Sequence, residues 1–406
     1  MSCWKMIKDQ STPHCFLKLV KNQRLTNPGC EKDVRHLEFE FDSTEVEYKA
    51  GDVLELIPCQ NEEAIDSFVK RCNLDPQALI TVHQEGDKSV PKEPIFLKSF
   101  IETTMDIASA SPRRFFFEVM SHFAKAEHEK ERLKYFVSPQ GRDDLYQYNQ
   151  KEKRTVLEVL QDFPSVHLPL EWLIQVVPPL KPRPFSISSS PTKHPNQIHL
   201  TVAVVSWKTP FKRKRNGLCS SWLAGLLPHQ DLQIAAWIHK GSLPPPCAST
   251  PIILVGPGTG CAPFKAFMEE RIEEDKQICT APVLFFFGCR NEGGDFLYRE
   301  FWEENAKGKG LLSVERGGGF FVAFSRDQMD KVYVQHKIRE NGAMIWDLMV
   351  KGASVYVAGS STNMPADVMS AFEDVISKQS GLSKDAAIAL IRKLQNTGKY
   401  NVEAWS

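Results

Sequence analysis

Alternating apolar and polar residues mark the first part of the chain. The stretch "HLEFEF" (36–41) alternates residue by residue, and "AGDVLELIP" (50–58) places a glycine turn before a second apolar run that ends at proline. Period-two alternation bounded by glycine and proline is typical of β-strands. Residues Asp33 to Pro58 therefore predict strands of a β-barrel.

The pattern changes to helical spacing from Asn61 to about Phe163. "EEAIDSFVKRCNLDP", "SPRRFFFEVMSHFA" and "RTVLEVLQDFP" each place apolar residues three or four positions apart. Strand patterns return in "PRPFSISSSP" (182–191) and "IHLTVAVVSW" (198–207). A helical segment is thus predicted to be inserted into a β domain.

A proline-rich segment, "GSLPPPCASTP" (241–251), separates this part from the rest, because three consecutive prolines exclude both helix and sheet interior. Beyond it, the short apolar strands "IILVG", "VLFFFG" and "SVYVAG" alternate with helical patterns. That alternation predicts a parallel sheet covered by helices on both faces.

Composition narrows the functional classes. The chain has 406 residues, enough for two or three domains, and Lys+Arg and Asp+Glu both number 50, which argues against a nucleic-acid surface. Its 10 cysteines and 11 histidines show no metal-ligand spacing, so we predict no metal site and reduced thiols. We see no signal peptide and no apolar run of the ~20 residues that a membrane helix needs, so a cytoplasmic protein without a membrane span is expected. "KRKR" (212–215) is either a solvated hairpin tip or a nuclear-localisation run.

The stretch "VGPGTGCAPF" (255–264) is the first candidate for chemistry. Gly256, Gly258 and Gly260 lie between an apolar strand and a helical pattern, where glycine lets the backbone approach a phosphate at a helix N-terminus. No Gly-Lys-Ser/Thr follows, and Cys261 stands where the third glycine of the dinucleotide fingerprint belongs. Taken alone, the segment is also compatible with a tight turn that serves only packing.

A second segment, "AFSRDQMDKVYVQ" (323–335), supplies two cations, two hydroxyls and an amide. These are Ser325, Arg326, Lys331, Tyr333 and Gln335. Such a set suits the 2′-phosphate of NADP(H), whereas NAD would call for an acidic residue on its ribose. The alternative is an ordinary solvated helix start.

Two further segments add phosphate and ring chemistry. In "RPFSISSSP", Arg183 is suited to a pyrophosphate, Phe185 to stacking and Ser186 to hydrogen bonding. "NGLCSSWL" (216–223) adds a glycine and hydroxyls at a predicted helix start. Each alone is also compatible with an edge strand or a helix cap.

In this order and spacing, "RPFS", "GLCSS", "GPGTGCAPF", "FFFGCR", "SRDQMDKVYVQ", "YVAGS" and "EAWS" resemble the diflavin reductases, over nearly the whole chain from Pro13 to Ser406. The resemblance implies a multidomain α/β and β fold like that of ferredoxin-NADP reductase. It places an N-terminal tail at 1–12 and a FAD-binding domain at 13–246. Within that domain, an antiparallel barrel (13–60 and 164–246) carries a helical connecting insert (61–163). A parallel-sheet, Rossmann-like NADP(H)-binding domain follows at 247–406.

The resemblance also assigns roles residue by residue. FAD would be held by Lys153, Arg183, Pro184, Phe185, Ser186, Gly217, Leu218, Cys219 and Ser220. NADP(H) would be held by Gly258, Thr259, Gly260, Ser325, Arg326, Lys331, Val332, Tyr333, Val334, Gln335 and Asp367. Trp405 would cover the flavin ring, and Ser186, Glu403 and Trp405 would act in hydride transfer.

Several positions depart from the family pattern. Ala358 stands where the family has a cysteine, Ser360 replaces an acid, and Glu403 replaces an aspartate. The glycine triplet 317–319 looks inserted, and an insertion there would displace the 2′-phosphate pocket. We expect hydride transfer to survive, since the flavin performs the chemistry.

The function implied is that of an NADPH-dependent flavoprotein reductase. Hydride would pass from NADPH to FAD, and electrons would pass singly to FMN and then to an acceptor, the iron-sulfur assembly protein anamorsin. FMN would come from a flavodoxin-like domain that this chain is expected to lack. The alternatives are an NADPH diaphorase acting directly from FAD, and a truncated isoform that binds partners without turnover.

Overall fold

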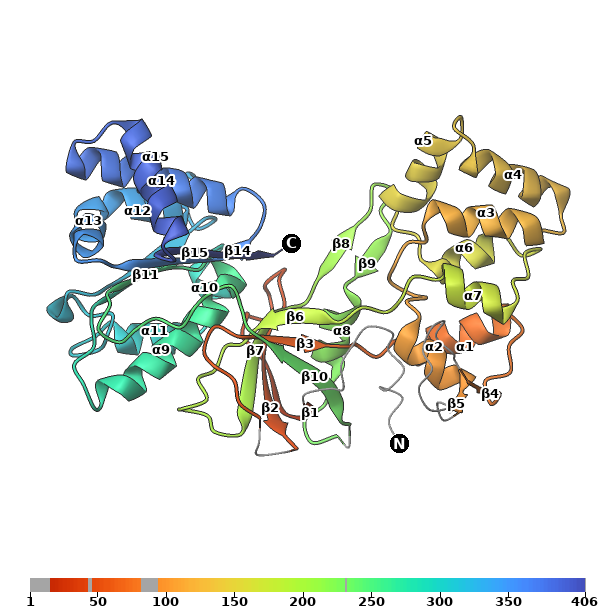
Figure 1. Ribbon diagram of the computed structural model, residues 1–406, viewed down its shortest axis with the longest axis horizontal. Coiled ribbons are helices and arrows are strands. Elements are labelled where there is room, and N and C mark those ends of the chain that lie inside the picture. The colour runs from red at the N-terminus through yellow and green to blue at the C-terminus, as the bar shows by residue number, and fades with distance from the viewer. Residues whose placement is uncertain (1–14, 43–45, 82–93, 231, 406) are drawn as a thin grey trace. The chain divides into compact units, whose positions relative to one another are not determined.

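A computed structural model describes residues 15–42, 46–81, 94–230 and 232–405 (Figure 1). The chain forms two compact units. The first comprises 1–13, 56–183 and 204–225, and the second comprises 14–55, 184–203 and 226–406. The predicted tail, 1–12, lies outside the described residues. The predicted domain boundaries divide the chain differently from these units and stay a prediction.

A six-stranded sheet forms the first layer of the second unit. Its order is β6-β3-β10-β1-β2-β7, and β1 pairs antiparallel with both β10 and β2, as β2 does with β7. The isolated bridge between Ile187 and Leu200 joins the chain just after β6 to β7, which closes the sheet into the predicted barrel. The strands are β1 (Cys15–Arg24), β2 (Val34–Phe41), β3 (Val53–Leu56), β6 (Arg183–Ser186), β7 (Gln197–Ala203) and β10 (Ile234–His239).

A parallel sheet of five strands forms the other part of the second unit, in the order β13-β12-β11-β14-β15. All four neighbouring pairs are parallel, as the alternating strand and helix pattern predicted. The strands are β11 (Ile252–Val255), β12 (Val283–Cys289), β13 (Gly319–Phe324), β14 (Ser354–Ser360) and β15 (Tyr400–Trp405). The predicted fold class is therefore confirmed.

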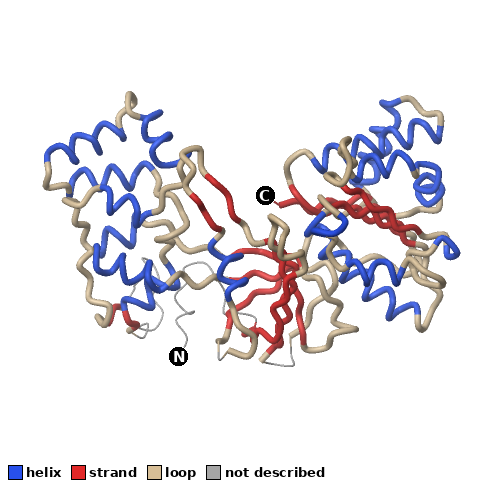
Figure 2. The backbone as a smooth tube through the Cα atoms, turned by 180° about the vertical axis from the view of Figure 1, so that it is seen from behind, coloured by secondary structure: helices blue, strands red, loops and turns tan. Residues whose placement is uncertain are grey.

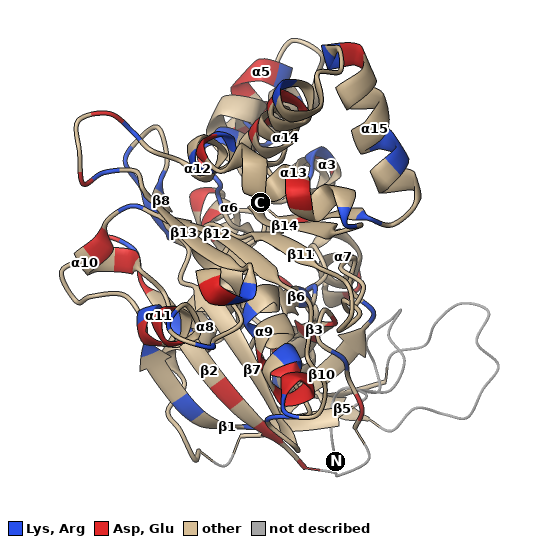
Figure 3. Cartoon of the chain, turned by 90° about the vertical axis from the view of Figure 1, so that its left-hand side faces the viewer, with Lys and Arg blue, Asp and Glu red and all other residues tan. Residues whose placement is uncertain are grey.

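Helices cover both faces of the parallel sheet (Figures 1 and 2). Leu254 and Phe285 pack with Trp302 on one face, where α9 and α11 lie, whereas Val255 and Phe286 pack with the other group of helices. Lys or Arg positions occur together with Asp or Glu positions along α11 and α15 (Figure 3). The helices are α9 (Ala262–Asp275), α10 (Glu292–Asp295), α11 (Arg299–Asn305), α12 (Val334–Glu340), α13 (Gly342–Val350), α14 (Met364–Ser380) and α15 (Lys384–Asn396).

The first unit is mainly helical around one apolar core that contains Phe117, Leu133 and Val159. The three segments with predicted helical spacing lie on α1, α3 and α6. The helices are α1 (Glu62–Arg71), α2 (Leu97–Thr104), α3 (Arg114–Phe123), α4 (Glu127–Val137), α5 (Arg142–Leu145), the π-helix η2 (Tyr146–Lys151), α6 (Val156–Asp162), α7 (Leu170–Val176) and α8 (Leu218–Gly225). Two small sheets pair β4 (Leu79–Ile80) with β5 (Ile95–Phe96) and β8 (Ser206–Lys208) with β9 (Lys214–Asn216).

The basic run 212–215 lies on the β8–β9 hairpin, as one of its two interpretations predicted. Arg215 donates to Glu158 at 2.7 Å, and the Arg213 guanidinium lies 3.5 Å from the same carboxylate. The acidic partner of this run is therefore in the same chain.

The cysteines in the described ranges are all free thiols. None of the helices in the part of the chain that the structure describes is long and apolar enough to cross a membrane.

Candidate nucleotide and flavin sites

The glycine-rich turn lies at the carboxyl end of β11. A 3₁₀ turn, Gly258–Cys261, leads directly into α9, which has Pro263 in its first turn. Gly258 has φ +58°, and a Cβ on Gly260 would collide with the carbonyl oxygen of Ala358 on β14. The predicted strand, turn and helix are confirmed. The turn presents bare backbone at a helix start, which suits a phosphate.

Ser325 and Arg326 follow the carboxyl end of β13, next to the end of β12. The Ser325 N–H donates to the Cys289 carbonyl at 3.0 Å, and the Arg326 N–H donates to the Arg290 carbonyl at 2.8 Å. The Arg326 side chain is 54% exposed, and its guanidinium lies 3.9 Å from the Glu31 carboxylate. A cation thus lies at the sheet edge where open α/β sheets bind their ligands.

The remaining members of the predicted 2′-phosphate set divide into two groups. Lys331 and Tyr333 are exposed, whereas Val334 is buried in the core and Val332 packs against it. The two valines therefore leave only their backbone for a ligand. The Gln335 amide donates to the Asp367 carboxylate at 3.4 Å, which brings α12 and the first turn of α14 together.

The glycine triplet lies at the opposite end of β13 from Ser325. Gly317 has φ +74° and ends a short 3₁₀ turn, and a Cβ on Gly318 would lie 2.6 Å from the Leu311 carbonyl oxygen. From Gly319 to Phe324 the register with β12 is unbroken. The triplet therefore forms a tight turn just before β13. It does not disturb the pairing of β13 with β12 at the carboxyl end, where Ser325 lies.

Ser186 and Glu403 meet within the second unit. The Ser186 hydroxyl, on β6, donates to Oε1 of Glu403, on β15. Ser242 donates to the other carboxylate oxygen, Oε2, at 2.9 Å. The sequence motifs did not identify Ser242 as a site residue, because it lies in the proline-rich segment that was predicted only to separate two parts of the chain. No sequence signal marks it, because its role depends on a contact made in the fold.

Trp405 and the substituted positions also lie together at the carboxyl ends of β14 and β15. Ala358 lies opposite Glu403, and Ser360 lies opposite Trp405, in the parallel register. Trp405 is half-buried against the core of the sheet, and its carbonyl accepts from the Ser361 N–H at 2.8 Å. Ala358 is completely buried, and its methyl side chain offers no hydrogen-bond donor or acceptor beside Glu403.

The predicted FAD residues are shared between the two units. Pro184, Phe185 and Ser186 belong to the second unit, and the others belong to the first. In the first unit, Lys153 follows the π-helix with φ +47°, in the left-handed region that non-glycine residues seldom adopt. Local strain of this kind is concentrated at functional sites.

Gly217 opens the second predicted phosphate loop. A Cβ there would lie 2.8 Å from the Ser220 hydroxyl and 2.9 Å from the Val205 side chain, so the turn into α8 requires glycine. Cys219 is buried, and desolvation raises the pKa of its thiol to about 12. The thiol therefore stays protonated and is unsuited to act as a nucleophile. The Arg183 guanidinium lies 3.9 Å from the buried Asp106.

Two regions of the chain match known domain families. Residues 7–222 match the model described as FAD binding domain, and residues 254–369 match the model described as oxidoreductase NAD-binding domain. The chain is therefore a flavoprotein oxidoreductase with domains for FAD and for NAD(P).

Similarity to whole proteins identifies the family. The chain is 59% identical to NADPH-dependent diflavin oxidoreductase 1 of Arabidopsis thaliana, over 100% of this chain and 66% of that protein. It is 37% identical to the Xenopus laevis protein of the same name, over 98% and 67%, and 29% identical to bovine NADPH–cytochrome P450 reductase, over 96% and 59%. The chain belongs to the NADPH-dependent diflavin oxidoreductase family, and it spans about two thirds of the length of these diflavin oxidoreductases.

Proposed function

We propose that this chain transfers hydride from NADPH to FAD. The observation that carries the proposal is the hydrogen bond from Ser186 to Glu403, which joins the barrel to the carboxyl edge of the nucleotide-domain sheet. Ser186 is one of the predicted FAD residues, and Glu403 is the carboxylate predicted to act in hydride transfer. Trp405 lies two residues beyond Glu403 on the same strand.

The described residues fit both cofactors. Gly260 and Gly217 lie in turns that lead into helices, and a Cβ at either position would collide with neighbouring atoms. The exposed cations Arg326 and Lys331 fit the 2′-phosphate that distinguishes NADPH from NADH. We assign the remaining predicted FAD and NADP(H) residues to the same two sites.

When bound, FAD accepts the hydride that NADPH supplies. Glu403 would supply a negative charge that offsets the positive charge left on the nicotinamide. Ser186 orients the carboxylate through Oε1, and Ser242 holds it through Oε2. Two serine hydroxyls therefore hold the two oxygens of the Glu403 carboxylate. These contacts are present even though Ala358 stands where the family has a cysteine. Trp405 would cover the ring of bound FAD and would have to move aside for nicotinamide.

Cofactor content tests this proposal. The purified chain is expected to release stoichiometric FAD on denaturation and no FMN, because its loops fit FAD and neither matched domain is a flavodoxin-like one. Stoichiometric FMN in the extract would contradict the proposal.

We further infer that electrons pass from FAD to FMN on a flavodoxin-like domain and then to an acceptor such as anamorsin, in the cytoplasm. Membership of the diflavin oxidoreductase family supports the FMN step. Adding a separate FMN domain to the NADPH-reduced chain tests it. FMN reduction is expected, whereas reduction of ferricyanide alone would favour a diaphorase.

A further inference from the structure

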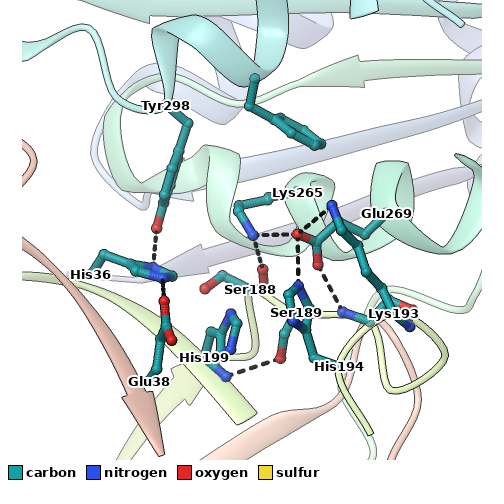
Figure 4. Close-up of polar contacts among 12 residues, drawn as sticks. His36, Glu38, Ser188, Ser189, Lys193, His194, His199, Lys265, Glu269 and Tyr298 are labelled. Carbon is teal, nitrogen blue, oxygen red and sulfur yellow. Dashed lines mark hydrogen bonds and ion pairs between the residues drawn. The ribbon is translucent and has the colours of Figure 1, made fainter. Parts of the chain in front are cut away.

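Two histidines and a glutamate, none of them among the predicted cofactor residues, form a cluster on the barrel. His36 and Glu38 lie two positions apart on β2, so their side chains point to the same face of the sheet. His199 on β7 lies directly opposite Glu38 in the antiparallel register. One ligand atom from each of the three residues lies within 4.8 Å of the others (Figure 4).

The hydrogen bonds of His36 leave one ring nitrogen directed at the cluster. Its Nδ1 lies 2.9 Å from the Tyr298 hydroxyl, and its Nε2 lies 3.0 Å from Oε1 of Glu38. The Tyr298 hydroxyl is itself 2.6 Å from Thr201 Oγ1. A hydroxyl that pairs with one nitrogen of a histidine orients the ring and leaves the other nitrogen for a metal.

His199 contributes an unexplained buried nitrogen. Its side chain is 2% exposed, and its Nδ1 makes no hydrogen bond with any described residue. Its Nε2 is already occupied, 3.3 Å from the Gln197 amide oxygen. Leaving a buried polar atom unpaired costs about 1 to 3 kcal/mol, and such atoms often mark a position for an ion or a water molecule.

The charges near the cluster permit a cation to bind. The ammonium of Lys21 pairs with Glu38 at 2.8 Å, but the Lys21 side chain is 48% exposed and is free to turn into solvent. Lys265 and His194 also lie nearby, and the carboxylate of Glu269 pairs with both of them, at 2.6 Å and 3.2 Å (Figure 4). With Lys21 displaced, the cluster offers one carboxylate and two imidazoles.

We propose that His36, Glu38 and His199 bind one divalent transition-metal ion, with Zn²⁺ the best match, and leave a fourth position for water. Zn²⁺ takes nitrogen and oxygen ligands at about 2.0 to 2.2 Å, which places tetrahedral ligand atoms ~3.3 Å apart. Nε2 of His36 lies 3.0 Å from Oε1 of Glu38, and all three ligand atoms lie within 4.8 Å of one another, so side-chain rotation has to shorten only the longer separations. The sequence showed no metal motif because two of the ligands lie on one strand and the third lies on a strand far away in the chain.

Calorimetric titration of the full chain with Zn²⁺ tests this site. The protein is first treated with chelator, and its thiols, including the exposed Cys247 and Cys279, are alkylated so that they do not compete for zinc. We expect one saturable equivalent of Zn²⁺ and a higher melting temperature with the metal bound. Glu38→Gln and His199→Gln should each weaken binding at least tenfold. Glu38→Gln changes a partly exposed side chain, so it remains informative if His199→Gln does not fold.

His239→Gln is the matched control. His239 faces Glu55 at 3.1 Å, which forms a histidine–carboxylate pair without a second histidine in the ligand set. This variant should bind Zn²⁺ like the wild type. The absence of a saturable equivalent, or equal binding by wild type and Glu38→Gln, would overturn the proposal whatever the chain's activity with NADPH.

Discussion

The hydroxyl of Ser186 donates a hydrogen bond to the carboxylate of Glu403 and so links a barrel strand to the last strand of the nucleotide-binding sheet. The two residues are 217 positions apart in the chain. Both residues belong to the second unit, and our account of hydride transfer rests on their contact.

Removing this hydroxyl should slow flavin reduction more than it weakens cofactor binding. For Ser186→Ala we expect the rate of FAD reduction by NADPH to fall about 10- to 100-fold, since a hydrogen bond aligned for the reaction is lost. Ser242→Ala should give a smaller loss, because Glu403 keeps its bond from Ser186. Anaerobic stopped-flow absorbance measures both rates. Ser249→Ala, in the same proline-rich segment, is the control. An equal effect of Ser249→Ala and Ser242→Ala would contradict a specific role for the Ser242 hydrogen bond.

Arg326→Ala should discriminate between the two nicotinamide cofactors. Losing a charge-assisted contact to the 2′-phosphate costs about 1.5 to 3 kcal/mol, or roughly ten- to a hundredfold in NADPH affinity, and it should leave NADH nearly unchanged. Arg299→Ala, an exposed arginine paired with Glu303 on α11, is the control. Equal losses for NADPH and NADH would place Arg326 outside the 2′-phosphate pocket.

Trp405→Ala should improve the use of NADH relative to NADPH. If the ring covers the flavin, nicotinamide must displace it, and only NADPH has the phosphate contacts that favour this displacement. Steady-state kinetics with ferricyanide gives the ratio of kcat/KM for the two cofactors. Trp405→Phe should fall between Trp405→Ala and wild type. If the ratio is unchanged in Trp405→Ala, Trp405 does not cover the flavin and serves only to pack against the sheet.

Glu269 should make the second unit sensitive to acid. Burial disfavours its charge, but the hydrogen bond with His194 and the ammonium of Lys265 outweigh burial and lower its pKa to about 2. A carboxyl whose pKa is depressed on folding stabilises the protein above its unfolded pKa, and this contribution disappears as the pH falls from about 4.5 to 2. Glu269→Gln should therefore cost about 3 kcal/mol at pH 7 and less near pH 3. Thermal unfolding at several pH values measures this, and a cost independent of pH would contradict it.

The strands and helices were predictable because their apolar residues repeat locally. Leu37 and Phe39 alternate with polar neighbours on β2. The turn at 256–260 is rich in glycine because a Cβ at Gly256 or Gly260 would collide with neighbouring atoms. Pairings between distant residues were not predictable in the same way. Ser242 meets Glu403, and Arg215 meets Glu158, through tertiary contacts that leave no periodic trace. The roles of Ser186, Glu403 and Trp405 came from family resemblance, and their assignment remains a prediction.

The most direct test of hydride transfer is anaerobic mixing of the FAD-loaded chain with NADPH while the visible flavin absorbance is followed. The account predicts rapid loss of that absorbance with NADPH, a much slower loss with NADH, and a slower NADPH reaction in Glu403→Gln with FAD still bound. Flavin that stays oxidised in excess NADPH, or a Glu403→Gln variant as fast as wild type, would contradict it.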